Sequence, residues 1–287
     1  MKLANTLAAL VFIGGVVFGQ AAFAQGHEDE AKPDRQKWTF AGPFGKFNPA
    51  QLQRGFKVYR EVCSNCHQLH ITFGSLGQPG GPGFTDDQVK ALAAEYKVKD
   101  APNEAGDVLD RPGRPSDYFP APFPNPEAAK AANGGALPPE MSLLAKARGY
   151  KRGFPTFIFD AFTQYQEQGP DYIVGILTGY EEAPKGVAME PGVNYNKMMP
   201  GHKIAMPKPL SDGQVAYDDG TPTTVYQYAK DVTAFLMWAA EPTLVERKRT
   251  GFSVMIFLII FSGLLYYTKK KVWADVHGHA PSGSHAH

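Results

Sequence analysis

The sequence predicts a mainly α-helical domain with long irregular loops, followed by one C-terminal transmembrane helix. Apolar residues recur at helical spacing in several separate segments. The 30 glycines and 24 prolines among 287 residues interrupt these segments with stretches unsuited to regular structure. An uncharged run of 17 residues, from Gly251 to Tyr267, lies at the short end of the length range for a membrane-spanning helix.

Charge and composition narrow the possible partners. The 29 Lys and Arg residues balance the 28 Asp and Glu residues, so the chain lacks the basic footprint of a nucleic-acid-binding protein. No internal repeat is visible along the sequence, which speaks against an array of repeated units.

The N-terminus reads as a secretory signal peptide over residues 1–24. Lys2 supplies its positive end, residues 7–18 form its apolar run, and Ala22-Phe23-Ala24 matches a small-residue cleavage site. The mature chain is then expected to start at Gln25. The alternative is an uncleaved anchor helix, although the apolar run is short for a bilayer core of ~30 Å.

The first helix of the mature chain is expected to open at Asn48 and Pro49, a side-chain cap followed by proline at the first helical position. Leu52, Phe56, Tyr59, Val62 and Cys63 then form one apolar stripe. This helix therefore delivers the first cysteine of the chain to an apolar interior.

The run Cys63-Ser64-Asn65-Cys66-His67 has the C-x-x-C-H spacing with which c-type haem is attached. Two thiols three residues apart lie on one face of a helical turn, where both can form thioethers with one porphyrin, and His67 is the expected iron ligand. A chance pair, a redox dithiol and half of a zinc site are the alternatives. The chain holds only these two cysteines, so a disulfide beside attached haem and a thiolate cluster are excluded.

Several weaker elements follow the motif. A second short helix is expected from Thr85-Asp86-Asp87, and a proline-rich loop without regular structure, lying over the haem, over residues 103–125. Pro139 is expected to start a helix that ends near Gly149. Residues 154–162 are aromatic and ambiguous, whereas residues 171–178 are expected to form a helix stopped by Gly179.

The loop region over residues 183–213 holds most candidates for the second axial ligand of the iron. They are Met189, Met198, Met199, His202 and Met206. Met206 is preferred because residues 204–207 are apolar and Pro207 stiffens the backbone, which keeps a weak thioether ligand in place. His202 remains the alternative, since imidazole also binds iron well. Met141 and Met237 are expected on helices as core residues.

The C-terminal part predicts a long helix and a membrane anchor. Thr221-Pro222 is expected to cap a helix that contains Val225 and Ala239 and ends or kinks at Pro242. The anchor is expected over residues 243–273. Basic residues flank both its sides, so charge does not orient it, but export places the domain of residues 25–242 outside and a histidine-rich tail, residues 274–287, inside.

Eight further runs are distinctive: RGFKVY at 54–59, YFPAPFPN at 118–125, AANGGALPP at 131–139, SLLAKAR at 142–148, LTGY at 177–180, IAMP at 204–207, DDGTP at 218–222 and FLMWAAEP at 235–242. On these runs the sequence resembles the cytochrome c1 family, in its alphaproteobacterial form, over nearly the whole mature chain. It departs from the mitochondrial pattern between Gly149 and Gly169, where it is longer. With no further cysteine, it cannot staple that longer loop by a disulfide, as some bacterial members do.

The resemblance implies a cytochrome c-like haem domain with one haem c attached through Cys63 and Cys66. It assigns His67 and Met206 to the axial positions and Arg148 to the neighbourhood of a haem propionate. It also implies an electron-transfer subunit of ubiquinol-cytochrome c reductase, the cytochrome bc1 complex, in the bacterial inner membrane. Cytochrome b and the Rieske iron-sulfur protein would then be its partners in the complex, and a cytochrome c its electron acceptor.

The functional expectation depends on the iron's coordination. Iron held by His67 and Met206 has no open position, so the chain would have no catalytic site of its own and would move one electron at a time. Two alternatives stay open: an enzyme or sensor whose iron lacks Met206 and binds a small ligand, and a tethered electron carrier of another complex.

Overall fold

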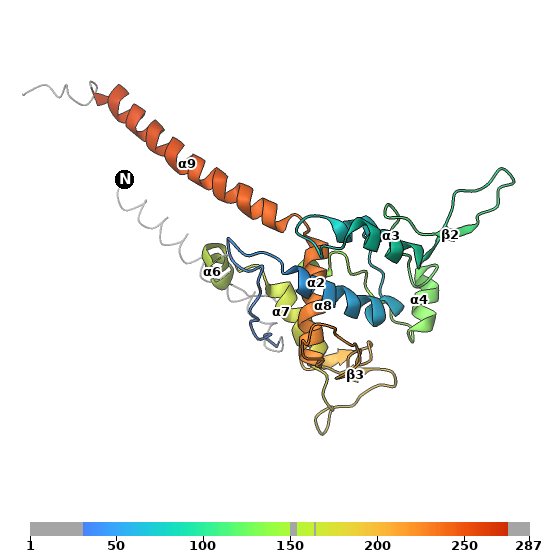
Figure 1. Ribbon diagram of the computed structural model, residues 1–287. Coiled ribbons are helices and arrows are strands. Elements are labelled where there is room, and N and C mark those ends of the chain that lie inside the picture. Colours follow the sequence, from blue (N-terminus) through green and yellow to red (C-terminus); the bar gives the residue numbers. More distant parts are fainter. Residues whose placement is uncertain (1–30, 150–153, 164, 275–287) are drawn as a thin grey trace, which may run out of the picture.

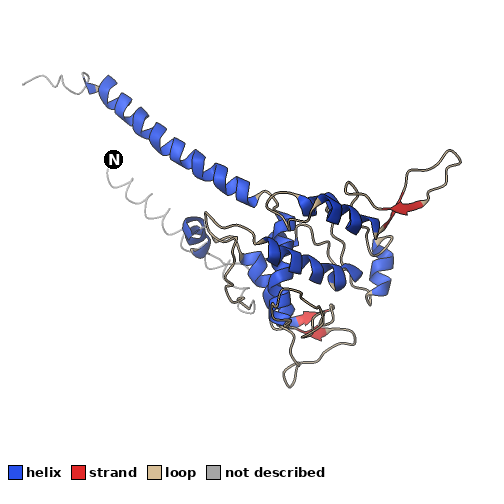
Figure 2. Cartoon of the chain, viewed as in Figure 1, coloured by secondary structure: helices blue, strands red, loops and turns tan. Residues whose placement is uncertain are grey.

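The computed structural model describes residues 31–149, 154–163 and 165–274. The predicted signal peptide, residues 1–24, and the histidines of the tail, from His277 onward, lie outside them. The helices are α2 (Pro49–Glu61), α3 (Asp86–Ala94), α4 (Pro126–Ala132), α5 (Leu144–Ala147), α6 (Thr156–Thr163), α7 (Gln168–Thr178), α8 (Val225–Ala240) and α9 (Leu244–Val272). Two antiparallel pairs add the strands β1 (Lys97–Lys99), β2 (Asp110–Pro112), β3 (Asn194–Tyr195) and β4 (Lys203–Ile204). The mainly helical class predicted from the sequence is confirmed (Figures 1 and 2).

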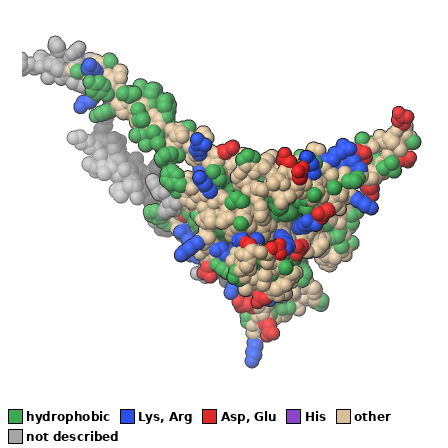
Figure 3. All heavy atoms as spheres, in the orientation of Figure 1, with side chains coloured by type: hydrophobic (Ala, Val, Ile, Leu, Met, Phe, Trp, Pro, Cys, Tyr) green, Lys and Arg blue, Asp and Glu red, His purple; other side chains and the backbone are tan. Residues whose placement is uncertain are grey.

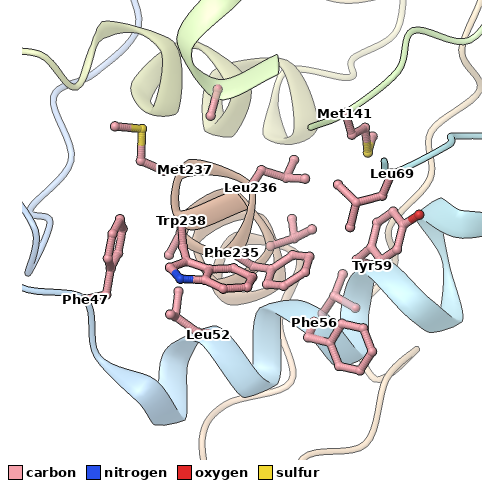
Figure 4. Close-up of a cluster of buried hydrophobic side chains, with 14 of the residues drawn as sticks. Phe47, Leu52, Phe56, Tyr59, Leu69, Met141, Phe235, Leu236, Met237 and Trp238 are labelled. Carbon is pink, nitrogen blue, oxygen red and sulfur yellow. The ribbon is translucent and has the colours of Figure 1, made fainter. Parts of the chain in front are cut away.

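The core of the domain forms where α2 crosses α8 (Figure 4). Phe56 and Tyr59 of α2 pack against Phe235 of α8, with ring centroids 5.6 and 5.9 Å apart. The crossing is close because α2 has no side chain at Gly55: a Cβ there would lie 2.0 Å from the carbonyl oxygen of Asp231. The two backbones are therefore in direct contact.

A polar clamp locks the same crossing. The guanidinium group of Arg54 donates to Asp231 at 2.8 Å and to Asp219 at 2.7 Å. The carboxylate of Asp231 is fully buried on α8, and the amides of Gln51 and Gln227 also donate to it, at 3.1 and 2.9 Å. A buried carboxylate needs such partners, since an unpaired buried charge is strongly destabilising.

The predicted start of α2 is confirmed. The side chain of Asn48 accepts hydrogen bonds from the backbone N–H groups of Ala50 and Gln51, and Pro49 occupies the first helical position. The predicted helix after Thr85 is also present as α3, closed by a capping box between Thr85 and Gln88.

Other elements differ from the expectation. The helix expected from Pro139 shrinks to α5, because Pro139 and Met141 use their backbone groups elsewhere: the Pro139 oxygen binds the His67 ring and the Met141 N–H binds the Gln68 oxygen. Met141 is buried, as expected, but on a loop rather than a helix.

The remaining differences are smaller. The loop over residues 103–125 contains β2, which pairs with β1. The ambiguous stretch at residues 154–162 contains α6. The helix expected after Thr221-Pro222 is α8, which starts at Val225 and is capped by Thr224 rather than by Thr221.

The last helix, α9, leaves the helical core as a single rod (Figure 1). Its 29 residues span about 43 Å, and in the described part of the chain it is the one helix long and apolar enough to cross a membrane. Only Leu244, at its start, is buried in the domain. Glu241, between α8 and α9, accepts hydrogen bonds from Lys146 of α5 and Arg247 of α9, so the root of α9 is tied to the core.

Candidate haem site

The cysteine motif follows directly from the end of α2. The chain leaves the helix at Val62 and forms a 3-10 turn, Cys63–Asn65. The backbone N–H groups of Cys66 and His67 both donate to the carbonyl oxygen of Cys63, at 3.1 and 2.9 Å. One short turn thus carries both thiols and the imidazole, as attachment of one porphyrin requires.

The thiols do not have the character of a redox dithiol. Cys63 is half-buried and Cys66 is exposed, and the two are not joined to each other. Burial raises the pKa of the Cys63 thiol to about 12, and the neighbouring Cys66 adds to the rise. Redox dithiols instead lower the pKa of one thiol to obtain a thiolate. Within residues 31–149, 154–163 and 165–274, no group of three or more His, Cys, Asp and Glu residues is placed to hold a metal ion.

His67 is prepared to bind a metal through one nitrogen. The residue is 9% exposed, and its Nδ1 lies 2.8 Å from the carbonyl oxygen of Pro139. A carbonyl oxygen can only accept, so Nδ1 carries the hydrogen and the lone pair is on Nε2. Burial lowers the pKa of His67, against the opposing effect of the hydrogen bond to Pro139, and so favours the neutral ring. The Tyr59 hydroxyl donates to the His67 oxygen at 3.2 Å and fixes the backbone.

Met206 lies just after the small β3–β4 pair, and its backbone is anchored at one atom. The hydroxyl of Tyr180 and the side-chain amide of Asn194 donate to its carbonyl oxygen, at 3.1 and 3.3 Å. Burial raises the pKa of Tyr180, so this phenol stays protonated and remains a donor. Met206 is partly accessible to solvent.

The other candidates for the second axial position have different environments. The ring of His202 stacks on Tyr195 at 5.5 Å, and its Nδ1 is buried without a hydrogen-bond partner in the described part of the chain. His202 also has a positive φ of 58°, an uncommon backbone conformation outside glycine. Met198 is buried beside Gly175 of α7 as a packing residue, and Met199 contacts the Tyr172 hydroxyl.

Arg148 directly follows α5, where its N–H caps the helix at Leu144. Its side chain is exposed, and it takes part in none of the ion pairs between residues that the structure describes. A guanidinium group in this state suits an anionic ligand such as a carboxylate. Its placement beside a propionate remains a prediction.

The residues present fit a covalently attached haem. Two thiols, one imidazole with its Nε2 lone pair available and one thioether are the donors that such a group uses. Leu137 and Leu143, on either side of the segment that binds His67, are 51% and 62% exposed. A large apolar group is the kind of partner that covers such side chains.

Sequence reasoning missed three supporting groups of this site. They are the Pro139 carbonyl oxygen, the Tyr180 hydroxyl and the Asn194 amide. Pro139 and Tyr180 both lie in distinctive runs, but nothing in the spacing tells which distant backbone or ring each contacts. The chain separations of 72 and 26 residues explain why.

Comparison with known proteins adds an independent finding. Residues 38–276 match the model of the Cytochrome C1 family. The chain is 61% identical over 276 residues to "Cytochrome b/c1" of Bradyrhizobium diazoefficiens, covering 96% of this chain but 40% of that longer relative. It is 48% identical to cytochrome c1 of Blastochloris viridis, over 91% of this chain and 94% of the relative. It is 45% identical to "Cytochrome c1, heme protein, mitochondrial" of Saccharomyces cerevisiae, over 83% and 71%.

Proposed function

Because this chain belongs to the cytochrome c1 family, we propose that it is the electron-transfer subunit of a cytochrome bc1 complex, ubiquinol-cytochrome c reductase. In this role it takes an electron from a Rieske iron-sulfur protein and passes it to a cytochrome c. Cytochrome b is its other partner. The relative named "Cytochrome b/c1", which is more than twice as long as the matched region, supports this assignment by its name.

The geometry of His67 is the observation that carries the proposal. Its Nδ1 donates to the Pro139 carbonyl oxygen, so the lone pair of Nε2 would be available to an iron ion, and the residue directly follows the second of two free thiols. Cys63 and Cys66 would hold a single haem c, His67 and Met206 its iron, and Arg148 a propionate. Bound there, haem c supplies a one-electron couple whose potential a methionine ligand raises.

The chain's own residues make the site a relay rather than a catalyst. The Tyr180 and Asn194 side chains hold the backbone of Met206, which would help to keep its thioether in place as an iron ligand. The imidazole is held by Pro139, whose carbonyl keeps one tautomer. With His67 and Met206 both holding the iron, no position would remain for a substrate, and the chain would serve the complex's net reaction without an open site of its own.

The proposed location follows from α9. One apolar helix anchors the chain in the bacterial inner membrane, with the haem domain of residues 25–242 on the periplasmic side and residues 274–287 in the cytoplasm. Two observations support this location. The N-terminal sequence is typical of an exported protein, and the apolar stretch of α9 is not buried against the rest of the described chain.

Mild detergent extraction followed by identification of the co-purifying subunits and haem types tests the proposal. We expect this chain with a covalent haem c, together with a cytochrome b and a Rieske protein. The matched control is Cys66→Ser, expected to lose the two-bond haem attachment. Purification with a terminal oxidase and without a cytochrome b would replace the proposal by a carrier of another complex.

A further inference from the structure

Two separate segments expose large apolar side chains beside the root of α9. Phe44 is 69% exposed, and Phe154, Ile158 and Phe159, at and within α6, are 76%, 39% and 59% exposed. We call these four residues the apolar rim. Exposed apolar side chains that gather in one region mark an interaction surface, whereas scattered single ones do not.

The contact of Phe44 with α9 shows where along this helix the apolar rim lies. Its ring meets the ring of Phe252 edge to face, with centroids 5.1 Å apart and planes at 72°. Phe252 is the second residue of the uncharged run that starts at Gly251. Phe44 therefore lies where α9 passes from the charged to the apolar part of its length.

Two hydrogen bonds connect α6 to the start of α9. The Arg247 guanidinium of α9 donates to the Gln166 side chain at 3.4 Å, and the side-chain amide of Gln168 donates to Asp160 of α6 at 3.3 Å. Figure 1 shows α6 on the side of the helical core from which α9 departs. Both parts of the rim thus lie near the first turns of the anchor.

Basic side chains complete the surface. Arg247 and Arg249 on α9 and Lys46 beside Phe44 are exposed, and Figure 3 shows basic side chains where α9 leaves the domain and apolar ones along the rod. Aromatic and apolar side chains combined with Lys and Arg are the composition of segments that lie in a membrane interface, where lipid phosphates meet the acyl chains.

We propose that the apolar rim inserts into the phospholipid interface on the side of the membrane that faces the haem domain. The chain would then be moored at two points, by α9 through the bilayer and by α6 and Phe44 at its surface. The occupant is lipid because the rim continues the surface of a helix that itself enters the bilayer. A second point of attachment would hold the domain at one fixed tilt.

Spin labelling of the full-length, haem-loaded chain in phosphatidylethanolamine-phosphatidylglycerol nanodiscs tests this. A nitroxide is attached at Phe159→Cys, and its collisions with oxygen, which concentrates in lipid, are compared with those with a water-soluble nickel chelate. Val254→Cys in α9 is the lipid control. Leu109→Cys, 61% exposed at the β1–β2 hairpin far from α9, is the aqueous control.

The expected result is an oxygen preference at position 159 like that at 254, with a nickel preference at 109. A nickel preference at 159 would overturn the proposal, and so would shielding from both reagents, which would indicate a protein neighbour instead. Specific labelling at position 159 rests on the proposed function, because haem attachment uses the thiols of Cys63 and Cys66 and leaves them unable to take the label. Uptake of label by the unsubstituted chain would indicate failed attachment, an outcome distinct from a misplaced rim.

Discussion

The ring of His67 can bind a metal only through Nε2, because Nδ1 donates its hydrogen to the Pro139 carbonyl oxygen at 2.8 Å. This orientation does not depend on a ligand, since the contact joins two parts of the chain itself. Met206, the other proposed ligand, has its backbone oxygen held by Tyr180 and Asn194. Both proposed axial ligands are therefore positioned by neighbouring residues rather than by the iron.

Replacing Met206 by Ala is expected to open the sixth coordination position and to lower the reduction potential. The shift should be on the order of 0.2 V, within the ~0.8 V range over which axial ligands tune haem. Redox titration of the purified protein, followed by its optical spectrum, measures the change. His202→Ala is the matched control and should leave the potential in place. The reverse pattern would assign the sixth position to His202.

For single residues, the sequence is enough to predict the cysteines that would bind the haem and the candidate axial ligands. It is not enough to predict the groups that hydrogen-bond to those ligands. Cys63, Cys66 and His67 lie within five residues of one another, so their spacing can be recognised in the sequence alone. The partners of His67 and Met206 lie 72, 26 and 12 residues away in the sequence, and only the folded backbone brings their carbonyl and side-chain groups together.

Among the elements, the crossing of α2 and α8 determines where the motif lies. The chain enters the site from the end of α2, so any displacement of α2 from α8 moves Cys63. The absence of a side chain at Gly55 and the clamp of Arg54 on Asp231 hold this crossing.

Gly55→Ala is expected to destabilise the domain by about 3 kcal/mol, at the upper end of the cost of overpacking. The added Cβ would meet a backbone oxygen at 2.0 Å, and backbone cannot turn away. Gly175→Ala is the control, since its nearest neighbour is the flexible Met198 side chain at 3.1 Å. Guanidinium unfolding monitored by circular dichroism compares the two. Equal losses of stability in the two variants would show that α2 can move away from α8 at no cost, and that the close contact at Gly55 does not stabilise the domain.

The loop before Tyr118 should carry a pH dependence. Arg111 donates two hydrogen bonds to Asp117, at 2.6 and 2.9 Å, and this pairing lowers the pKa of Asp117 to about 2 from an ordinary 3.8. A carboxylate with a depressed pKa stabilises the fold above its ordinary value, and that stability is lost as the pH falls from about 4 to 2.

Asp117→Asn is therefore expected to lower the melting temperature at pH 7 and to flatten its fall between pH 4 and pH 2. Thermal unfolding followed at several pH values measures both effects. Glu104→Gln, an exposed residue in no ion pair between described residues, is the control and should follow the unsubstituted protein. A steep fall that persists in Asp117→Asn would place the acid sensitivity elsewhere.

Element prediction succeeded where local rules dominate and failed where distant contacts compete. Asn48 and Thr85 cap their helices by hydrogen bonds to residues within three positions, Pro49 takes the first helical position, and α2 and α3 start where expected. The helix expected at Pro139 is cut to α5 because two of its backbone groups bind His67 and Gln68. No local pattern carries that information.

For the whole molecule, the joint between α8 and α9 separates the domain from its anchor. Leu244 is 2% exposed and packs into the core, and Arg247 binds Glu241. Beyond this first turn, the helix makes few contacts with the domain. The domain therefore does not depend on the membrane-spanning part for its core.

A chain ending after Arg249 is expected to come off the membrane without detergent, because the apolar rim alone is a weak and reversible attachment, and to keep an unchanged haem spectrum. One ending after Pro242 should be less stable by about 2 kcal/mol, because it loses the buried Leu244 side chain. Urea unfolding of the two soluble forms compares them. If neither form retains its haem spectrum, α9 would be part of the folding unit rather than an anchor alone.

Carbon monoxide added to the reduced, full-length protein tests the central claim most directly, since it binds haem iron only where an axial position is open. With His67 and Met206 both on the iron, the absorption bands should stay unchanged. Formation of a carbon monoxide adduct in the folded protein would contradict the account and assign the chain to ligand binding or catalysis.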